Sequence, residues 1–441
     1  MPEEIKRTLP AQNFTTTGAV VNFRDSWQIF RIISEFIDGY QFLSKFKKEV
    51  TILGSARLPK NSHYYKLAED LGFLLGKNGF TTITGGGPGI MEAANKGAFE
   101  AGGGTVGINI QLPFEQRINP YVKDSVGFFY FFSRKVMLTS PANAFVFFPG
   151  GFGTLDEFFE VVDYMELGHM QRVPVVLVGR DFWGPVLKFL RNNSGGLVHS
   201  VSQEIVDEWH VVDTAEDAFK YIKDSKDLSN VCEVGDESIY CQGGADWRVF
   251  RIMAELVDGF EFLTKLKNDV TVLGTRSVLP GTKYYDTAYE TGKMLAQNGF
   301  TTITGGGPGI MEAANKGAFE AGGESVGINM RTDHGDRVNN YITKSAGFFF
   351  PFVRKLIITS PSKAFVFFPG GFGTLHQLFE LLTLQETKKM ERVPMILVGK
   401  DFWQPMLEFF HVMFHDFRTI SLTDQDLVKV VDNADEILKL L

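Results

Sequence analysis

The sequence predicts an α/β fold, a Rossmann-like parallel sheet flanked by helices, that is built twice in tandem. Two observations predict it. Short apolar runs alternate with helical patterns, and nearly the same sequence occurs at two places 220 residues apart. Runs that are apolar on both faces and separated by helices are typical of parallel sheets covered on both sides. In such sheets, ligands bind at the carboxyl ends of the strands.

The repeat is long and faithful. The 26 residues from Asn78 to Gly103 recur without a change from Asn298 to Gly323. The similarity extends upstream to Trp27 and Trp247, and downstream through the apolar run that begins at Val173. Each unit is therefore about 200 residues long, which is the size of a domain and not of a solenoid repeat.

These limits give the predicted domain organisation, in which the two units form an internal pseudo-dimer. The stretch between the units is polar and rich in Gly, Ser and Asp, as expected of a linker. The predicted segments are an N-terminal extension at 1–26, a first domain at 27–222, a linker at 223–246 and a second domain at 247–441.

Within the first unit, strands and helices are expected in alternation. Residues 49–55 are predicted to form a buried strand that ends in a glycine turn, and residues 64–79 a helix that stops at glycine. The next elements in order are a strand at 80–87, a helix at 89–103, and strands at 105–110, 144–151 and 173–179.

Composition limits the classes of partner. The chain is 44% hydrophobic and 22% charged, as in globular proteins, and its net charge of −8 with no long basic run argues against nucleic acid. The most apolar stretch, Val126 to Phe132, is too short to cross a bilayer. The first 25 residues carry charges and no apolar run, and Cys232 and Cys241 are the only cysteines. We therefore expect a cytoplasmic protein with no signal peptide.

Two glycine loops lie where ligands are expected, each between a strand and a helix. They are Gly85–Gly89 and Pro149–Thr154. Glycine allows positive φ and lets an anion approach the backbone amides, and the following helix offers unpaired N–H groups. The pair suits a phosphate and its sugar, although both loops could be tight turns without a ligand. The sequence GGGPGI lacks the G-x-G-x-x-G spacing of a dinucleotide site.

The second loop differs between the units only beyond the glycines. Asp156 and Glu157 in the first unit become His376 and Gln377 in the second. Thr154 and Glu157 have the spacing of a capping box, and glutamine could serve the same capping role. The exchange therefore keeps a helix start and removes a negative charge, which points to the first unit as the chemically competent one. Random sequence drift at a capping position would also give this exchange of glutamate for glutamine.

A basic pair, Arg134 and Lys135, follows an aromatic run and recurs in the second unit. The arginine could hold a phosphate or the rim of a base, or the pair could be a solvated helix surface. The neighbouring phenylalanines are expected in the core or an interface. The eight histidines show no metal-binding spacing, so no metal or other cofactor is predicted.

These motifs together resemble the LOG family, the cytokinin-activating phosphoribohydrolases that are often labelled lysine decarboxylase-like. The family pattern is GGGxxGxM followed by PGGxGTxxE. The stretch "GGGPGIM" resembles the first part, with one residue fewer between the glycines, and "PGGFGTLDE" matches the second. The resemblance covers both units. It implies hydrolysis of the N-glycosidic bond of a nucleoside 5′-monophosphate, for instance a purine with an N6 substituent, to a free base and ribose 5-phosphate.

The resemblance also implies roles for individual residues. Arg134 and Glu157 would be the catalytic pair, and Glu160 would reach the ribose hydroxyls. Members are usually dimers, so the two units would pair within one chain, and a further homo-oligomer is left open. The remaining substrate-binding residues would be Gly86, Gly87 and Met91 in the pocket, Gly150, Gly151, Gly153 and Thr154 at the phosphate, and Arg57, which has Ser277 opposite it in the second unit.

Two other functions stay open at this point. A protein with the same fold could bind a nucleotide or cofactor without turnover. A lysine decarboxylase would normally need pyridoxal phosphate on a lysine, for which Lys135 is the nearest candidate, but nothing else in the sequence resembles such a site. Because Gln377 carries no negative charge, we expect the second unit to be inactive or crippled.

Overall fold

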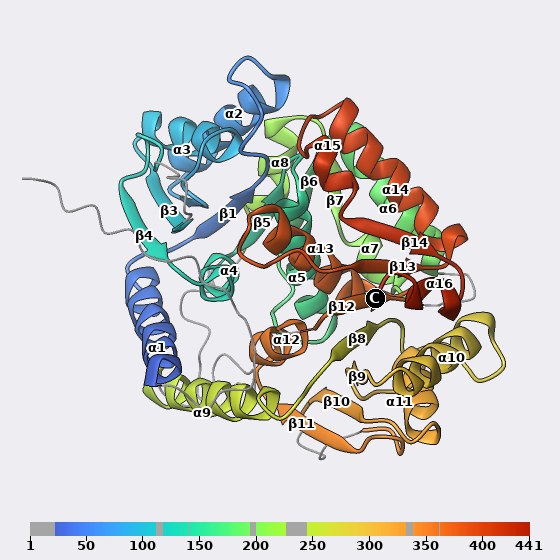
Figure 1. Cartoon of the computed structure of the whole chain (residues 1–441). Helices are drawn as coiled ribbons and strands as arrows, with labels where there is room; N and C mark the ends of the chain where they lie inside the picture. The colour runs from blue at the N-terminus through green and yellow to red at the C-terminus, as the bar shows by residue number, and fades with distance from the viewer. Residues whose placement is uncertain are drawn as a thin grey trace, which may run out of the picture.

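A computed structural model describes residues 23–111, 118–140, 142–194, 200–225, 245–331, 338–360 and 362–441. Most of the predicted extension and linker, including both cysteines, therefore lies outside the described residues. Figure 1 shows two α/β halves. None of the described helices combines the length and the apolarity needed to cross a membrane.

The described strands form two seven-stranded sheets, one in each unit, and every pairing is parallel. The first sheet has the order β4-β3-β2-β1-β5-β6-β7, and the second, β11-β10-β9-β8-β12-β13-β14, repeats it. The first comprises β1 Glu49–Leu53, β2 Thr81–Thr84, β3 Gly104–Ile110, β4 Asp124–Phe128, β5 Ala144–Phe147, β6 Val175–Val178 and β7 His210–Val212. The second comprises β8 Asp269–Leu273, β9 Thr301–Thr304, β10 Ser325–Met330, β11 Lys344–Phe348, β12 Ala364–Phe367, β13 Met395–Val398 and β14 Val428–Val431.

Helices connect the strands and cover both faces of each sheet. In the first unit they are α1 Phe23–Leu43, α2 His63–Lys77, α3 Ile90–Glu100, α4 Phe131–Thr139, α5 Phe152–Glu166, α6 Arg180–Ser194, α7 Gln203–Asp207 and α8 Ala215–Ile222. In the second they are α9 Ala245–Leu263, α10 Lys283–Gln297, α11 Ile310–Glu320, α12 Pro351–Thr359, α13 Phe372–Glu386, α14 Lys400–His415, α15 Leu422–Gln425 and α16 Ala434–Leu438. The predicted fold class is confirmed.

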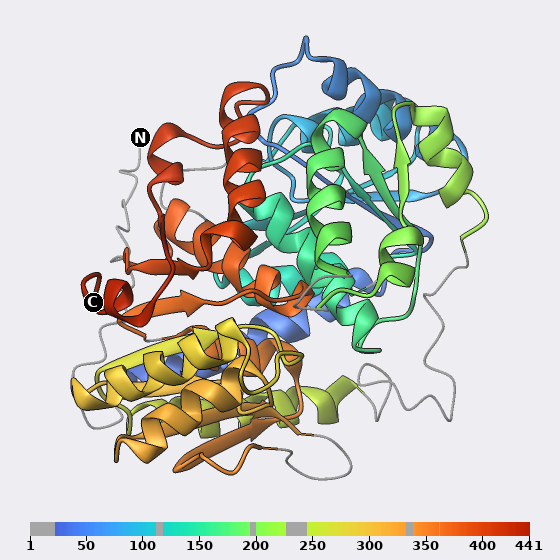
Figure 2. The ribbon, with the colours of Figure 1, turned by 90° about the vertical axis from the view of Figure 1, so that its right-hand side faces the viewer.

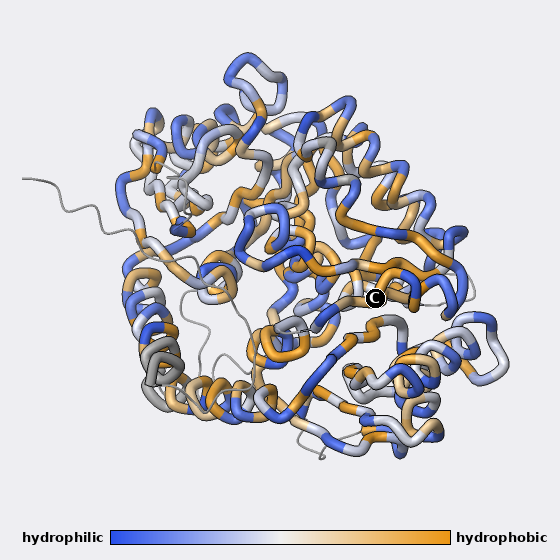
Figure 3. The backbone as a smooth tube through the Cα atoms, viewed as in Figure 1, coloured by the Kyte–Doolittle hydropathy of each residue, from blue (hydrophilic) through white to orange (hydrophobic). Residues whose placement is uncertain are grey.

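The sequence explains the local structure of the helix after β1. Ser62 caps α2, because its hydroxyl accepts a hydrogen bond from the Tyr65 amide at 3.1 Å. The helix ends before Gly79, whose φ of 76° continues the chain in the left-handed region that favours glycine. Figure 3 shows the matching hydropathy: β13 is apolar along its length, whereas α14 alternates. The sheets are therefore the inner layer of each unit.

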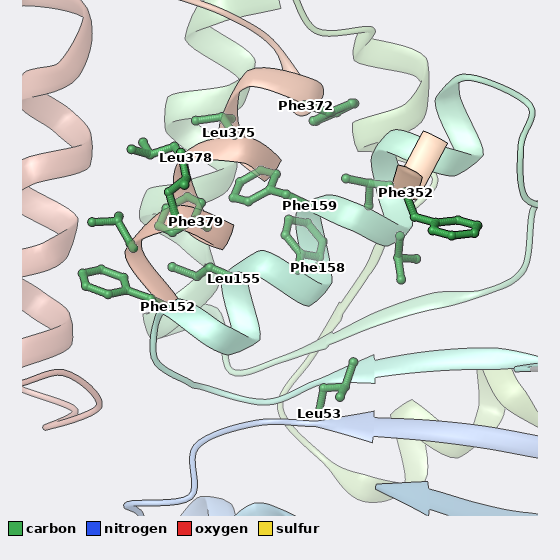
Figure 4. Close-up of a cluster of buried hydrophobic side chains, with 14 of the residues drawn as sticks. Leu53, Phe152, Leu155, Phe158, Phe159, Phe352, Phe372, Leu375, Leu378 and Phe379 are labelled. Carbon is green, nitrogen blue, oxygen red and sulfur yellow. The ribbon is translucent and has the colours of Figure 1, made fainter. Parts of the chain in front are cut away.

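The two units pack against each other through α5 and α13. Phe159 and Phe379 stack at 5.3 Å between ring centroids, and Phe152 meets Phe410 at 5.1 Å. Figure 4 shows Phe152, Phe159 and Phe379 among the apolar side chains between α5 and α13. One continuous core of buried residues spans both units. Elsewhere, α6 and α14 run side by side, and α1 meets α9 (Figures 1 and 2).

The strand order places a switch point between β1 and β5, because β2 to β4 follow on one side of β1 and β5 to β7 on the other. Open α/β sheets bind ligands beyond the carboxyl ends of the strands at such a point. The two glycine loops follow β2 and β5, so the fold brings them to this edge.

Candidate active site

The loops at the switch point are tied together by backbone hydrogen bonds. The Ser55 amide, just after β1, donates to the Pro149 carbonyl at 3.0 Å, and the Ile90 amide donates to the Ser55 carbonyl at 3.0 Å. The turn after β1 therefore holds both glycine loops in fixed positions relative to each other.

The first glycine loop requires glycine at two places. Gly86 has φ 72° and Gly89 has φ 69°, and a Cβ on Gly89 would lie 2.3 Å from the Ser55 carbonyl oxygen. Side chains then fix the loop. The Thr84 hydroxyl accepts from the Gly86 amide at 3.0 Å, and the Asn119 side chain donates to the Gly87 carbonyl at 3.1 Å.

The second glycine loop corrects one prediction. Helix α5 begins at Phe152 with Gly151 as its N-cap residue, and no side chain caps it. The predicted capping box of Thr154 and Glu157 is therefore wrong, because both residues lie inside the helix. Thr154 turns back over the loop: a Cβ on Gly150 would lie 2.1 Å from its hydroxyl oxygen. Capping consequently does not account for Glu157.

Arg134 and Glu157 meet at the edge between the loops. The Arg134 Nη1 atom lies 3.3 Å from Glu157 Oε1, and Arg134 Nε donates to the Ile108 carbonyl at 3.0 Å. Both side chains are about nine-tenths buried. Burial raises the pKa of the Glu157 carboxyl, and the Arg134 charge opposes that rise. The pair places an ionisable carboxylate beside a fixed cation in a largely dry site.

The guanidinium of Arg134 packs on the first glycine loop. A Cβ on Gly85 would lie 2.5 Å from Arg134 Nη2 and 2.8 Å from the sulfur of Met91. The structure therefore brings together the predicted pocket residues Gly86, Gly87 and Met91 with the predicted catalytic pair.

Glu160 and Lys135 lie in a different place, in a buried charge cluster between α5 and α13. Lys135 Nζ is 2.7 Å from Asp156 Oδ1, 3.2 Å from Glu160 Oε2 and 3.7 Å from Glu380 Oε1 of the second unit. Lys135 is 1% exposed and Glu160 is 2% exposed. The predicted contact of Glu160 with ribose hydroxyls stays a prediction, and its carboxylate here faces Lys135.

Electrostatics in this cluster are asymmetric. Burial would lower the pKa of Lys135, but Asp156, Glu160 and Glu380 together raise it well above its ordinary value. Burial raises the pKa of Asp156 to about 7. Across the cluster, burial lowers the pKa of Lys355, the counterpart of Lys135. The first lysine is therefore the permanent cation of the cluster.

Arg57 reaches across to the second unit. Its guanidinium lies 2.5 Å from Glu386 Oε1 and 4.0 Å from Asp424 Oδ2. Burial and the neighbouring Asp424 raise the pKa of Glu386 to about 7, against the opposing charge of Arg57. The edge of the first site is thus built partly from the second unit.

Sequence reasoning missed two kinds of residue. Asn95 and Asn119 hold the first loop, with Asn119 Nδ2 donating to Asn95 Oδ1 at 3.0 Å. Their recurrence as Asn315 and Asn339 at the same spacing could have pointed to them. Residues of the opposite unit, such as Glu386, could not have been found without the packing of α5 on α13.

The second unit keeps the scaffold and lacks the pair. Arg354 Nε donates to the Ile328 carbonyl at 2.9 Å, and a Cβ on Gly305 would lie 2.4 Å from its Nη2 atom, as in the first unit. Gln377 stands in place of Glu157. Among the described residues, no carboxylate lies within 4.0 Å of Arg354. Lys355 contacts His376, whose pKa is lowered well below its ordinary value by burial and by the nearby lysines.

Comparison with known proteins agrees with this geometry. The profile of the family described as "Possible lysine decarboxylase" matches residues 91–222 and 311–441, more than half of the chain. The chain belongs to this family. It is the LOG family of the sequence analysis, since matched relatives are named cytokinin riboside 5′-monophosphate phosphoribohydrolases. The two matched segments confirm that the LOG unit is present in tandem.

Two of these LOG relatives define the extent of the similarity. The protein of that name from Mycobacterium tuberculosis is 30% identical over 169 residues, which cover 37% of this chain and 88% of the relative. The rice protein named LOG is 32% identical over 153 residues, covering 33% of this chain and 61% of the relative. Each similarity therefore corresponds to about one unit of the chain.

A solved structure similar to this LOG chain is the molybdenum cofactor binding protein from Rippkaea orientalis. It is 22% identical, has a TM-score of 0.32, and is matched over 96% of its length and 40% of this chain. A score of this size carries no argument about function.

The family description does not match the environment of Lys135. A lysine that forms a Schiff base must be reached by its partner and must be able to lose its proton. Lys135 is almost fully buried, engages three carboxylates and has a raised pKa. In this LOG protein, Lys135 is therefore suited to a structural role.

Proposed function

We propose that the first unit hydrolyses the N-glycosidic bond of a nucleoside 5′-monophosphate, releasing the base and ribose 5-phosphate. The observation that supports it is the buried pair of Arg134 and Glu157 between two glycine loops. Relatives named for this reaction on cytokinin ribosides agree with it, and a purine with an N6 substituent is the substrate class to test first.

In this proposal the second glycine loop positions the substrate. Gly150, Gly151, Gly153 and Thr154 bring backbone amides and the start of α5 to the 5′-phosphate, since helix N-termini attract anions. The ribose then extends toward Glu157, which lies in the second turn of the same helix. Met91 and the first loop line the space for the rest of the nucleotide.

Glu157 supplies the charge that the reaction requires. Cleavage of the bond builds positive charge on the sugar, which an ionised carboxylate stabilises while it orients the attacking water. The water oxygen bonds to the anomeric carbon, the electrons of the broken bond remain with the base, and the proton lost by water ends on the base or on solvent. The charge of Arg134 favours the ionised form of Glu157 against the effect of burial, and the contact between the two side chains holds Glu157 in place.

The test is release of free base from AMP and from N6-substituted AMP, compared with Glu157→Gln. A positioned acid–base group typically contributes about 10²–10⁴-fold, so this variant should lose that factor in kcat while it still binds the nucleotide. Gln377→Ala is the matched control and should keep full activity. Undiminished turnover in Glu157→Gln would overturn the proposal.

Binding without turnover is the second candidate, and the same assay separates the two. A protein that binds AMP stoichiometrically but releases no base from any monophosphate of a purine and pyrimidine panel would be a nucleotide carrier.

A further inference from the structure

Residues of the opposite unit contact each second glycine loop. The backbone carbonyls of Thr419 and Ser200 lie against Gly151 and Gly371, respectively. At the third glycine of each loop, the facing side chains differ in charge. A Cβ on Gly153 would lie 3.6 Å from the methyl carbon of Thr383, which projects from α13. A Cβ on Gly373 would lie 3.2 Å from the Oδ1 atom of Asp163, which projects from α5. A neutral side chain therefore faces the first loop, and a carboxylate faces the second.

Lys355 and Arg354 act on the Asp163 carboxylate only from beyond ion-pair distance. Its closest basic group is His376, with Nδ1 3.5 Å from Asp163 Oδ2. Burial and two nearby lysines keep His376 uncharged, because its pKa lies well below its ordinary value. Among the described residues, no lysine or arginine nitrogen lies within 4.0 Å of the Asp163 carboxylate.

Asp163 does not replace the missing Glu157 of the second unit. Gly373 and Gln377 are four residues apart, so they lie on one face of α13 about one turn, or roughly 6 Å, from each other. Asp163 touches the Gly373 end of that turn, beside the loop, and forms no ion pair with Arg354. Its carboxylate therefore lies beside the loop and not at the place of the missing Glu157.

We propose that Asp163 makes the second unit reject phosphate, so that the chain binds one nucleoside monophosphate, in the first unit. The inference rests on the proposed function, because it takes the glycine loops as phosphate sites. A phosphate monoester carries a charge of about −1.5 to −2 at pH 7, and a carboxylate a few ångströms away repels it. Beside Thr383, the equivalent place in the first unit carries no charge.

The sharpest test starts from Glu157→Gln, which prevents turnover and makes the two units alike at this position. AMP binding is measured by equilibrium dialysis at pH 8. We expect one AMP per chain in this background. Adding Asp163→Thr should create a second site, at least about 10-fold tighter than before, and adding Thr383→Asp should remove the first. Asp163→Asn, which changes only the charge, checks that a gain of binding does not depend on altered packing.

The outcomes separate this inference from the proposed function. Two AMP molecules per chain in Glu157→Gln alone would overturn the role of Asp163 and leave the proposed function intact. So would a single site that persists in both Asp163→Thr and Asp163→Asn. No AMP bound to any of these folded variants would overturn both.

Acidity provides a second readout. Burial raises the pKa of Asp163 to about 7, with Glu166 and Glu160 of α5 adding to the rise and Lys355 and Arg354 of α12 opposing it. On α13, the facing group is the neutral His376. Lowering the pH from 8 to 6 should therefore raise AMP affinity in the second unit by about 10-fold in the Glu157→Gln protein, and far less once Asp163→Asn is added. An equal response in both proteins would count against Asp163.

Discussion

The two units are alike in their scaffold and different in their charges. The Thr84 hydroxyl donates to Asn95 Oδ1 at 2.7 Å in the first unit, and the Thr304 hydroxyl donates to Asn315 Oδ1 at 2.6 Å in the second. Asparagine donates to the loop carbonyl at 3.1 Å in both. By contrast, in the part of the chain that the structure describes, a carboxylate lies within 4.0 Å of the site arginine only in the first unit. The comparison teaches that the shape of the site and its chemistry are encoded by separate residues, so one can be lost without the other.

The largest expected difference between the two units is in the stability cost of replacing the lysines of the charge cluster. Lys135→Met leaves the buried carboxylates of Asp156 and Glu160 without their lysine, while Glu380 keeps Lys355 at 3.2 Å. The variant should reduce the free energy of unfolding by about 3–5 kcal/mol. Lys355→Met should cost less, about 1–2 kcal/mol, because burial already lowers its pKa. Urea denaturation of both variants measures the difference. Equal costs would show that the cluster is symmetric in energy.

The second expected difference is in activity, when the arginine of each unit is replaced. Arg134→Ala removes the charge that favours the ionised form of Glu157 and should reduce base release from AMP about 10²–10³-fold. The acid limb of the pH–rate profile of Arg134→Gln should also move to higher pH, since the rise in the pKa of Glu157 is then opposed by Lys135 alone. Arg354→Ala is the control and should stay within about twofold of the parent. A similar loss in both would place turnover in both units.

The smallest expected effect is a pH dependence of stability that is specific to one unit. The pKa of Asp163 is about 7 when folded against about 3.9 when unfolded, so between these values the folded state holds the extra proton. Stability from this group is present at low pH and is lost as the pH rises to about 7. Asp163→Asn should therefore reduce the fall in unfolding free energy between pH 5 and pH 8 by about 1–2 kcal/mol, because the side chain keeps some solvent contact.

Thr383→Asp should make the unfolding free energy fall further between pH 5 and pH 8, and Thr383→Asn should not change this pH dependence. Chemical denaturation at several pH values measures all three variants. A parent-like pH profile in Asp163→Asn would contradict the assigned titration.

Much of the fold could be predicted because buried parallel strands leave a strong signal. The runs at 49–55, 144–151 and 173–179 correspond to β1, β5 and β6. The edge strands β4 and β7 were not predicted. β4 is partly exposed along its length and lies in an aromatic run, and β7 has three residues. Edge strands are shorter and less apolar, so their periodicity is weak.

The candidate site was predictable where chemistry depends on local sequence. The glycine loops, Arg134 and Glu157 have recognisable spacing, and the structure brings them together. The start of α5 was misjudged, because Thr154 has the residue type of a cap but Gly151 occupies the cap position. Contacts such as that of Arg57 with Glu386 depend on how the two units pack against each other. The spacing of residues within one unit does not predict this packing.

The buried cluster has a consequence for how such a molecule can evolve. In a dimer of identical subunits, each interface residue occurs twice, once in each subunit. A change to histidine at the Asp156 position would therefore appear on both sides of the interface. Joining the subunits removes that restriction: Asp156 and His376 occupy matching places, with Oδ1 and Nε2 3.8 Å apart. Such an unlike pair at the centre requires two independently mutable halves, and gene fusion is the step that makes them heritable together.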